Sequence, residues 1–331
     1  MHKVYIDKIG EDLADQMYNA LEFIEWTKII LPDSKVFVKP NLAWPEPKPG
    51  VTTTPRFLDA LLSVLTSRTQ HVYVGESDGG TFPAEEAFVK NGMLDVCKRY
   101  NVPFVNLTHK PAVMIEDVVA GRPLKIEASR FLLEEIDVFI TLPVLKTHVV
   151  TTVTLGLKNQ WGCIPTPMRL LYHYFLDWGI VALNRAYAPQ ISILDGTYAM
   201  DRRGPLEGDA ISAGWMVVSD NVVALDAIGC HLLGVNPTDV RHIAFAEQEG
   251  LGFTDIAKMQ LNRPLPAPVI ESYLEPTVLD QIAIFLYKRK WWSQLAFASP
   301  LTPLLYRLMG RTAPGHYQPY PLPDYAHTSG H

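Results

Sequence analysis

The chain has 331 residues, a net charge of −6 from 29 basic and 35 acidic side chains, and 48% hydrophobic residues. This length and composition suffice for one large α/β domain or two smaller ones with a sizeable core. The acidic balance argues against a nucleic-acid binder that works through a broad basic surface, though not against local basic pockets. No uninterrupted apolar run is long enough for a membrane-spanning helix, and residues 1–10 contain no apolar signal segment.

Strands and helices are predicted to alternate in the first half of the chain. Residues 35–39 are typical of a short buried strand, and Thr54-Pro55 is typical of a helix start, with apolar residues at helical spacing behind it. Further elements are predicted at 71–75 (strand), 84–99 (helix interrupted at Asn91-Gly92) and 102–106 (strand).

The second half continues this pattern after one interruption. Residues 113–127 resemble a β-hairpin around AGRP, inserted at a sheet edge. The remaining predicted elements are strands at 137–142, 190–195 and 213–219, and helices at 167–186, 221–233 (capped by Asp220) and from Asn236 to Gly250. Such alternation predicts an α/β fold with a mostly parallel sheet and helices on both faces.

The composition changes after residue 261, where prolines become frequent and aromatic and basic residues mix. We therefore predict a domain at 1–261 and a C-terminal arm at 262–331. The favoured interpretation is an arm that packs on the domain or on the partner subunit of a homodimer. Contact of residues 282–310 with a membrane surface is the alternative, based on Trp291, Trp292 and the basic residues 288–290, but no clear basic stripe supports it.

The three cysteines, Cys97, Cys163 and Cys230, lie far apart and form no C-x-x-C pair. This spacing argues against a disulfide framework, a structural zinc site and an iron–sulfur cluster held by this chain alone. It favours a reduced compartment, and we expect a cytoplasmic protein. Cys163 is more simply a small buried thiol than a nucleophile, because the sequence offers it no base.

Polar residues follow four of the predicted strands. Ligands of open parallel sheets bind beyond the carboxyl ends of the strands, so these residues predict a cleft. They are Lys39 and Asn41 after 35–39, Glu76 to Gly80 after 71–75, Lys146 and His148 after 137–142, and Asp195 at the end of 190–195.

Each candidate has a functional and a structural interpretation. Lys39, Lys146 and Lys158 suit a phosphate or carboxylate, or they extend to the surface as ordinary lysines. Asp78 could hold a metal or a sugar hydroxyl, or it stabilises its own turn. Gly79 in the same turn could allow backbone amides to contact an anion. His148 could be a general base or metal ligand.

Three further residues are weighed in the same way. A lone histidine on an apolar helix, such as His173, is more often a core residue than a ligand. Asp195 at a strand end is a better candidate for a metal or hydroxyl ligand. Asp226 lies among apolar residues of a predicted helix, and because a buried carboxylate needs a partner, it could neutralise one of the lysines.

Six motifs in order between about residue 35 and residue 252 resemble the DUF362 family, a domain of unknown function. They are VFVKPNLAW, GESDGG, ITLPVLKTH, TLGLKNQWGCIP, ILDGTYAMDRRGPLEGD and VVSDNVVALDAIGCHLLG. The resemblance implies a single α/β domain and places the candidates above, with Asn159, at family motif positions. Many members carry ferredoxin-type cysteine clusters, which this chain lacks, so no iron–sulfur cluster is expected here.

These observations lead to a functional hypothesis. We expect an enzyme that acts on a small anionic substrate, a carboxylate or a phosphate, with a divalent metal as a further expectation. The alternative is a non-catalytic accessory protein that carries a metal or cofactor. The residues assigned are His148, Lys146 and Lys158 for catalysis, Lys39, Asn41, Asp78, Gly79 and Asn159 for ligand binding, and Asp195, Asp78 and His173 for a metal.

Overall fold

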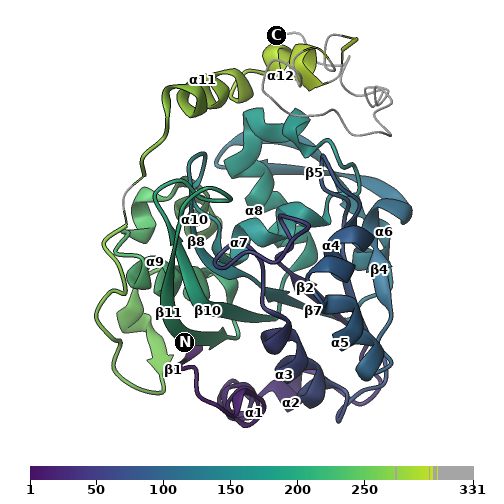
Figure 1. The fold of residues 1–331 in the computed structure, drawn as a ribbon, viewed down its shortest axis with the longest axis vertical. Helices are drawn as coiled ribbons and strands as arrows, with labels where there is room; N and C mark the ends of the chain where they lie inside the picture. The colour runs from purple at the N-terminus through teal and green to yellow at the C-terminus, as the bar shows by residue number, and fades with distance from the viewer. Residues whose placement is uncertain (273, 298, 301–303, 305–331) are drawn as a thin grey trace.

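A computed structural model describes residues 1–272, 274–297, 299–300 and 304 of the chain. Its centre is a mixed sheet with the strand order β12-β1-β11-β10-β7-β2-β3-β4, to which β8 attaches beside β10 and β9 beside β8 (Figure 1). The strands are β1 (His2–Lys8), β2 (Val36–Pro40), β3 (Val72–Glu76), β4 (Phe104–Asn106), β7 (Val138–Leu142), β8 (Val144–His148), β9 (Thr152–Val153), β10 (Ile191–Asp201), β11 (Asp209–Ser219) and β12 (Met259–Leu261).

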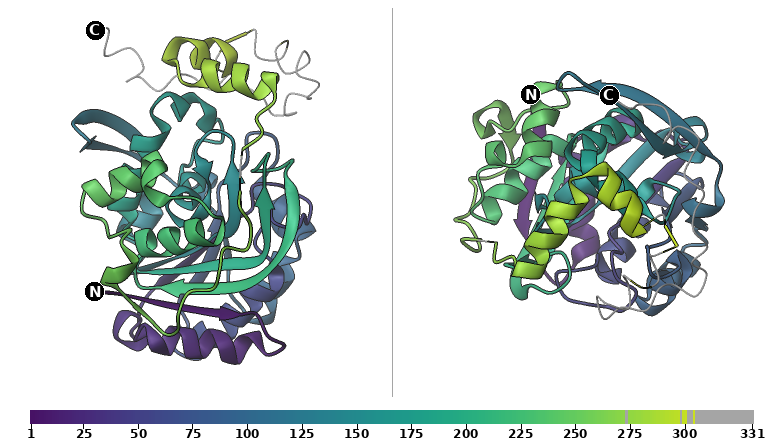
Figure 2. Two further views of the ribbon diagram at one scale, coloured as in Figure 1. Left: turned by 90° about the vertical axis from the view of Figure 1, so that its left-hand side faces the viewer. Right: turned by 90° about the horizontal axis from the view of Figure 1, so that it is seen from above.

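Five neighbouring strands, β10, β7, β2, β3 and β4, run parallel, which confirms the predicted mostly parallel α/β sheet. Strand alternation divides the core between the two faces of the sheet. Val36 and Val38 pack with one hydrophobic cluster, and Phe37 between them packs with the other. Helices cover both faces because each face of a parallel sheet is apolar (Figure 2).

One face carries α1 (Leu13–Phe23), α2 (Trp26–Ile29), α3 (Pro55–Leu65), α4 (Ala84–Lys90) and α5 (Met93–Arg99). The other carries α6 (Arg130–Glu134), α7 (Leu155–Asn159), α8 (Leu176–Tyr187), α9 (Val222–Leu232) and α10 (Arg241–Gln248). Short 3₁₀ helices lie at η1 (Leu107–His109), η2 (Gln160–Cys163), η3 (Arg169–Phe175), η4 (Pro237–Asp239) and η5 (Ile256–Lys258).

Several predictions need correction in detail. The hairpin forms, as β5 (Ala112–Val119) and β6 (Arg122–Ser129), but it is a separate two-stranded sheet that packs on α8 and does not extend the main sheet. The N-terminus of α9 is capped by Asn221, whose side chain accepts the N–H groups of Val223 and Ala224. Asp220 instead accepts the backbone N–H of Lys3, because the preceding strand directs it toward β1.

Beyond β12 the chain runs along α9 and then forms α11 (Val278–Tyr287) and α12 (Lys290–Phe297), which pack over η3 at one end of the molecule (Figures 1 and 2). The predicted division at residue 261 stays a prediction. Within the predicted membrane-contact segment 282–310, residues 298, 301–303 and 305–310 lie outside the described residues, as do residues 311–331 of the arm. Across the described ranges, no helix is long and apolar enough to cross a membrane.

Candidate functional site

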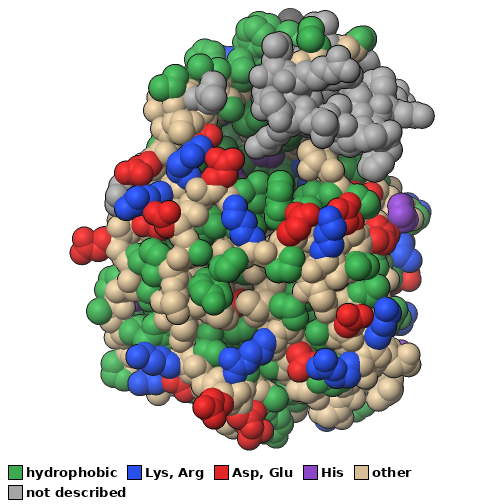
Figure 3. Space-filling model, in the orientation of Figure 1, with side chains coloured by type: hydrophobic (Ala, Val, Ile, Leu, Met, Phe, Trp, Pro, Cys, Tyr) green, Lys and Arg blue, Asp and Glu red, His purple; other side chains and the backbone are tan. Residues whose placement is uncertain are grey.

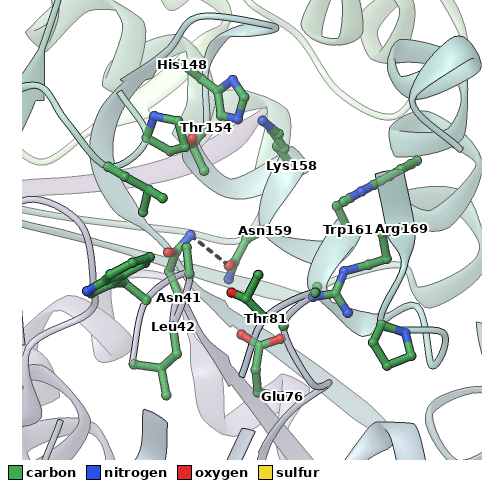
Figure 4. Close-up of a pocket in the computed structure, with 18 of the residues that line it drawn as sticks. Asn41, Leu42, Glu76, Thr81, His148, Thr154, Lys158, Asn159, Trp161 and Arg169 are labelled. Atoms are coloured by element: carbon green, nitrogen blue, oxygen red, sulfur yellow. Dashed lines mark hydrogen bonds between the residues drawn. The ribbon is translucent and has the colours of Figure 1, made fainter. Parts of the chain in front are cut away.

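A cavity of about 310 Å³ lies at the carboxyl ends of β2 and β3, where the sequence predicted a cleft (Figure 4). Its walls come from β8, α7, η2 and η3. Eight of the predicted site residues line it: Lys39, Asn41, Gly79, Lys146, His148, Lys158, Asn159 and His173. Residues far apart in the chain therefore meet in one place.

Lys39 and Glu76 form a buried ion pair in the floor of the cavity. Lys39 Nζ lies 2.5 Å from Glu76 Oε2 and also donates to the carbonyl of Pro40. The two side chains retain 1% and 6% of their accessible surface. A Cβ at Gly162 would lie 2.6 Å from Glu76 Oε1, so the backbone of η2 approaches the pair closely only because residue 162 is glycine.

Lys146 is fully buried and has no carboxylate among its hydrogen-bond partners. Its ammonium donates to Asn41 Oδ1 at 3.0 Å and to the Val51 carbonyl at 2.7 Å. Burial, reinforced by the nearby charge of Lys39, lowers the pKa of Lys146 to about 7. Lys146 can therefore change its charge near neutral pH, which an exposed lysine does not do.

Asn41 and Asn159 connect these lysines. Asn41 Nδ2 donates to Asn159 Oδ1 at 3.2 Å, and Asn159 Nδ2 donates to the Lys39 carbonyl and to Thr141 Oγ1. Figure 4 shows the two amides side by side between β2 and α7. The network joins the end of β2 to the helix that carries Lys158.

Lys158 differs from the other two lysines. Its Nζ atom is buried and has no hydrogen-bond partner within the described part of the chain. The indole N–H of Trp161, which also lines the cavity, has none either. Desolvation moves the pKa of Lys158 well below its usual value, and the charge of Lys146 adds to this effect. Two buried, unpaired donors on residues that line one cavity indicate a place for a ligand or water.

Two histidines line the cavity and are held neutral. His148 Nδ1 accepts the N–H of Val150, so the neutral ring carries its proton on Nε2. His173 Nδ1 lies 3.1 Å from the carbonyl oxygen of Arg169. Because a carbonyl oxygen can only accept, Nδ1 of His173 carries the proton and Nε2 of His173 has the lone pair. Burial lowers the pKa of His173 to about 4, and burial with the charge of Lys158 moves that of His148 well below 6.5. Figure 4 shows the Lys158 amine pointing toward the His148 ring.

Asp226 holds the helix that carries Lys158 and Asn159. Its two carboxylate oxygens accept the N–H groups of Gly156 and Leu157 at 2.6 and 3.0 Å, at the first turn of α7. Burial raises the pKa of Asp226 to about 8. The expectation that Asp226 neutralises a lysine is wrong, because backbone amides occupy both of its oxygens. The chain adopts positive φ angles at Thr152 (66°), in β9, and at Leu155 (47°), the first residue of α7; residues with a Cβ rarely adopt such angles.

The structure does not bring Asp78 and Asp195 into the cavity. Asp78 Oδ1 accepts the Ala84 N–H at the start of α4 and an N–H of Asn106. Asp195 accepts the Thr54 N–H at the start of α3 and two donors of Thr197. Both carboxylates thus stabilise turns and helix starts. Among the residues that the structure describes, no group of three or more His, Cys, Asp or Glu side chains is arranged to hold a metal ion.

The sequence placed Glu76 at the edge of the cleft without giving it a role, and it did not indicate the lining residues Trp161 and Arg169. Glu76 was identifiable in principle, because a buried Lys39 needs a counterion and Glu76 ends the neighbouring strand. The positions of Trp161 and Arg169 depend on how η2 and η3 fold back over the sheet, and no local pattern indicates that. Cys163 is fully buried, and burial raises the pKa of its thiol to about 12, as expected for a structural cysteine.

The C-terminal arm reaches the wall of the cavity. His173 lies between two aromatic rings, with centroids 5.8 Å from Trp161 and 5.8 Å from Tyr287 of α11. Helix α12 packs along η3, which carries Arg169 and His173. Both described helices of the arm therefore support one side of the site.

The fold and the site define an α/β protein with a cavity at the carboxyl ends of its parallel strands, and the charged residues that line this cavity are mostly basic. The family described as a domain of unknown function (DUF362) matches residues 36–231, and the chain belongs to this family, as its motifs indicated. It is 30% identical over 268 residues to a thylakoid-associated protein of the cyanobacterium Synechocystis sp., an alignment that covers 76% of this chain and 79% of that protein.

Two solved structures are similar at a lower level. The lactate racemase apoprotein of Thermoanaerobacterium thermosaccharolyticum aligns with 70% of this chain at 13% identity and a TM-score of 0.45. A protein of Thermotoga maritima aligns with 60% at 15% identity and a TM-score of 0.39. The chain covers 57% and 53% of these two structures, so it spans little more than half of each.

Proposed function

We propose that the protein is an enzyme that binds a small carboxylate or phosphate in this cavity and transfers protons on the bound molecule. The charge balance of the cavity carries the proposal. Four basic side chains, Lys39, Lys146, Lys158 and Arg169, line the cavity, whereas Glu76 is the one carboxylate among the described lining residues. Glu76 is already paired with Lys39. The remaining basic groups have no counterion in the lining, and a bound anion would supply one.

The two neutral imidazoles support a catalytic role over simple binding. His148 presents an N–H at Nε2 and His173 a lone pair, so the pair offers both a proton donor and a proton acceptor. Their lowered pKa values keep both rings uncharged at neutral pH. A cavity built only to hold an anion would gain more from charged imidazolium groups.

Calorimetric titration of the full-length protein with sodium phosphate and with sodium acetate tests the proposal. We expect saturable binding, weakened about tenfold or more in Arg169→Met and Lys146→Met, because each removes a donor or charge from a desolvated site. Lys98→Met, which changes an exposed lysine, is the control. If neither anion binds, or if both variants bind as the wild type does, the proposal fails.

The carrier alternative is tested on the same preparation. Native and denaturing mass spectra of the untagged protein would differ by the mass of a retained metal or cofactor. A stoichiometric excess that persists without turnover would favour the carrier, whereas an enzyme with an exchangeable substrate would show no such excess.

A further inference from the structure

The three cavity lysines have different surroundings, and the difference suggests different chemistry. Lys39 Nζ is paired with a carboxylate, and Lys146 Nζ donates to two oxygen atoms. Lys158 Nζ is as well buried as these, lines the same cavity, and has no hydrogen-bond partner among the described residues. An amine that neither pairs with an anion nor donates to an oxygen is poorly suited to remain an ammonium ion.

We propose that Lys158 is a covalent residue, whose amine forms an imine with the carbonyl carbon of a small aldehyde or ketone that carries an anionic group. This inference rests on the function proposed above and narrows the substrate class to oxo acids and their phosphate analogues. The neighbouring basic groups, Lys146 and Arg169, would hold the anionic end, and the amine would meet the carbonyl end.

The step balances without an oxidant or a further reactant. The Nζ lone pair forms the C–N bond, the carbonyl oxygen takes a proton and the nitrogen releases one, which gives a neutral carbinolamine. The nitrogen then loses a proton, the hydroxyl group takes one and leaves as water, and the C=N bond forms. The protons can pass through His148, which presents an N–H, and His173, which presents a lone pair. The unpaired indole N–H of Trp161 is available to the carbonyl oxygen.

The burial of Lys158 supports the nucleophilic form of the amine. Desolvation and the charge of Lys146 hold the pKa of Lys158 well below that of an exposed lysine, so its amine is unprotonated more often than that of an exposed lysine. The charge of Asp177 raises the pKa of Lys158, but Asp177 itself forms an ion pair with Arg241 at 3.3 Å. The positive φ at Leu155 and the Asp226 contacts fix the start of the helix that carries this amine.

Reductive trapping tests the proposal on the full-length protein. The protein is incubated at pH 7 with glyoxylate or pyruvate and sodium cyanoborohydride, and the adduct is located by peptide mass spectrometry. We expect one adduct per chain, on Lys158, formed at least tenfold faster than on the exposed Lys98. Its rate should rise less between pH 7 and pH 9 than the rate on Lys98 does. Acetate, which has no carbonyl that forms an imine, should give none.

The site of labelling in the wild type decides the question even if a variant misfolds. No adduct on Lys158 with either probe, or labelling spread evenly over exposed lysines, overturns the proposal. Lys158→Met should abolish the specific adduct, while Lys146→Met should retain it at a lower rate. If phosphate and acetate bind but no adduct forms, only the covalent role is wrong. If neither binding nor labelling occurs, the proposed function fails as well.

Discussion

Lys39 on β2 and Glu76 on β3 form an ion pair with an Nζ–Oε2 distance of 2.5 Å, and almost none of either side chain is exposed. The pair lies beneath the cavity, on adjacent parallel strands. Each charge is stable in this position only because of the other, since an unpaired charge buried at such a depth is strongly unfavourable. The first prediction follows from this dependence.

Glu76→Gln should destabilise the protein by about 3–5 kcal/mol, because it leaves the Lys39 ammonium buried without a counterion. The double variant Lys39→Met, Glu76→Gln should recover part of that loss, since both charges are then absent. Urea unfolding of the wild type, the two single variants and the double variant gives the coupling energy. Additive effects of the two changes would show that the pair is not coupled.

Gly162→Ala should weaken anion binding and lower the free energy of unfolding by about 1–3 kcal/mol. The reason is that the alanine Cβ would lie 2.6 Å from Glu76 Oε1 and 2.9 Å from Lys39 Nζ. Gly80→Ala is a matched control in the same cavity wall, where the nearest atom to the new Cβ is 3.7 Å away. Thermal unfolding and phosphate titration of both variants would check this. Equal behaviour of the two would mean that the floor of the cavity has room for a methyl group.

Asp226→Ala should destabilise the protein by about 1–3 kcal/mol, since it leaves the N–H groups of Gly156 and Leu157 without acceptors. Because these amides begin α7, we expect the variant also to lose specific labelling of Lys158. Asp226→Asn, which keeps one acceptor oxygen, should be intermediate in both measurements. If the variant unfolds more easily but its Lys158 is labelled as in the wild type, Asp226 has only a structural role.

His242→Leu should make the protein more resistant to acid. His242 is fully buried, neither ring nitrogen has a partner in the described part of the chain, and burial lowers its pKa to about 3. Its folded pKa lies below the unfolded value of 6.5, so the unfolded state binds the proton first and stability falls as the pH drops from 6.5 toward 3.

The wild type should therefore lose about 2–3 kcal/mol at pH 4.5 through this residue, a loss that His242→Leu should avoid. Urea unfolding at pH 7.5 and at pH 4.5 separates this effect from a change in packing, because packing alters the free energy of unfolding equally at both pH values. His173 and His148 add to the acid loss in both proteins, since their pKa values are lowered too. A parallel loss in variant and wild type would exclude His242 as a source of acid sensitivity.

Tyr287→Ala should raise the pKa of His173 from about 4 toward 6.5, because it removes a ring that packs 5.8 Å from the imidazole and admits water. Histidine chemical shifts followed by NMR across pH 3–8 would measure this. Phe285→Ala is the control, since that ring on the same helix is 54% exposed. An unchanged His173 titration would mean that α11 has no influence on the site.

Figure 3 shows hydrophobic side chains gathered at the upper end of the molecule, over the described part of the arm. Ile282, Phe285 and Trp291 are each more than half exposed there. The sequence favoured an arm that packs on the domain or on a partner subunit, and α12 lies along η3. Contact of the arm with a membrane or with a second subunit stays a prediction.

Local sequence patterns determined the parallel strands, most of the helices and the edge of the sheet where ligands would bind. Residue alternation and helical spacing are short-range properties, and the carboxyl ends of parallel strands meet at one edge whatever their side chains are. For that reason the sequence placed Lys39 and Lys146 at one edge of the sheet, whereas the position of Lys158 depends on α7.

Only the tertiary structure decided which polar group faces which. Asp195 ends a predicted strand just as Lys39 does, and Asp78 follows another, yet the N-termini of α4 and α3 pack against these aspartates and occupy their oxygens. Glu76 became the counterion of Lys39 and Asp226 the cap of α7. The partner of a buried charge is a residue distant in the chain, brought close by packing, and no pattern along the sequence records that contact.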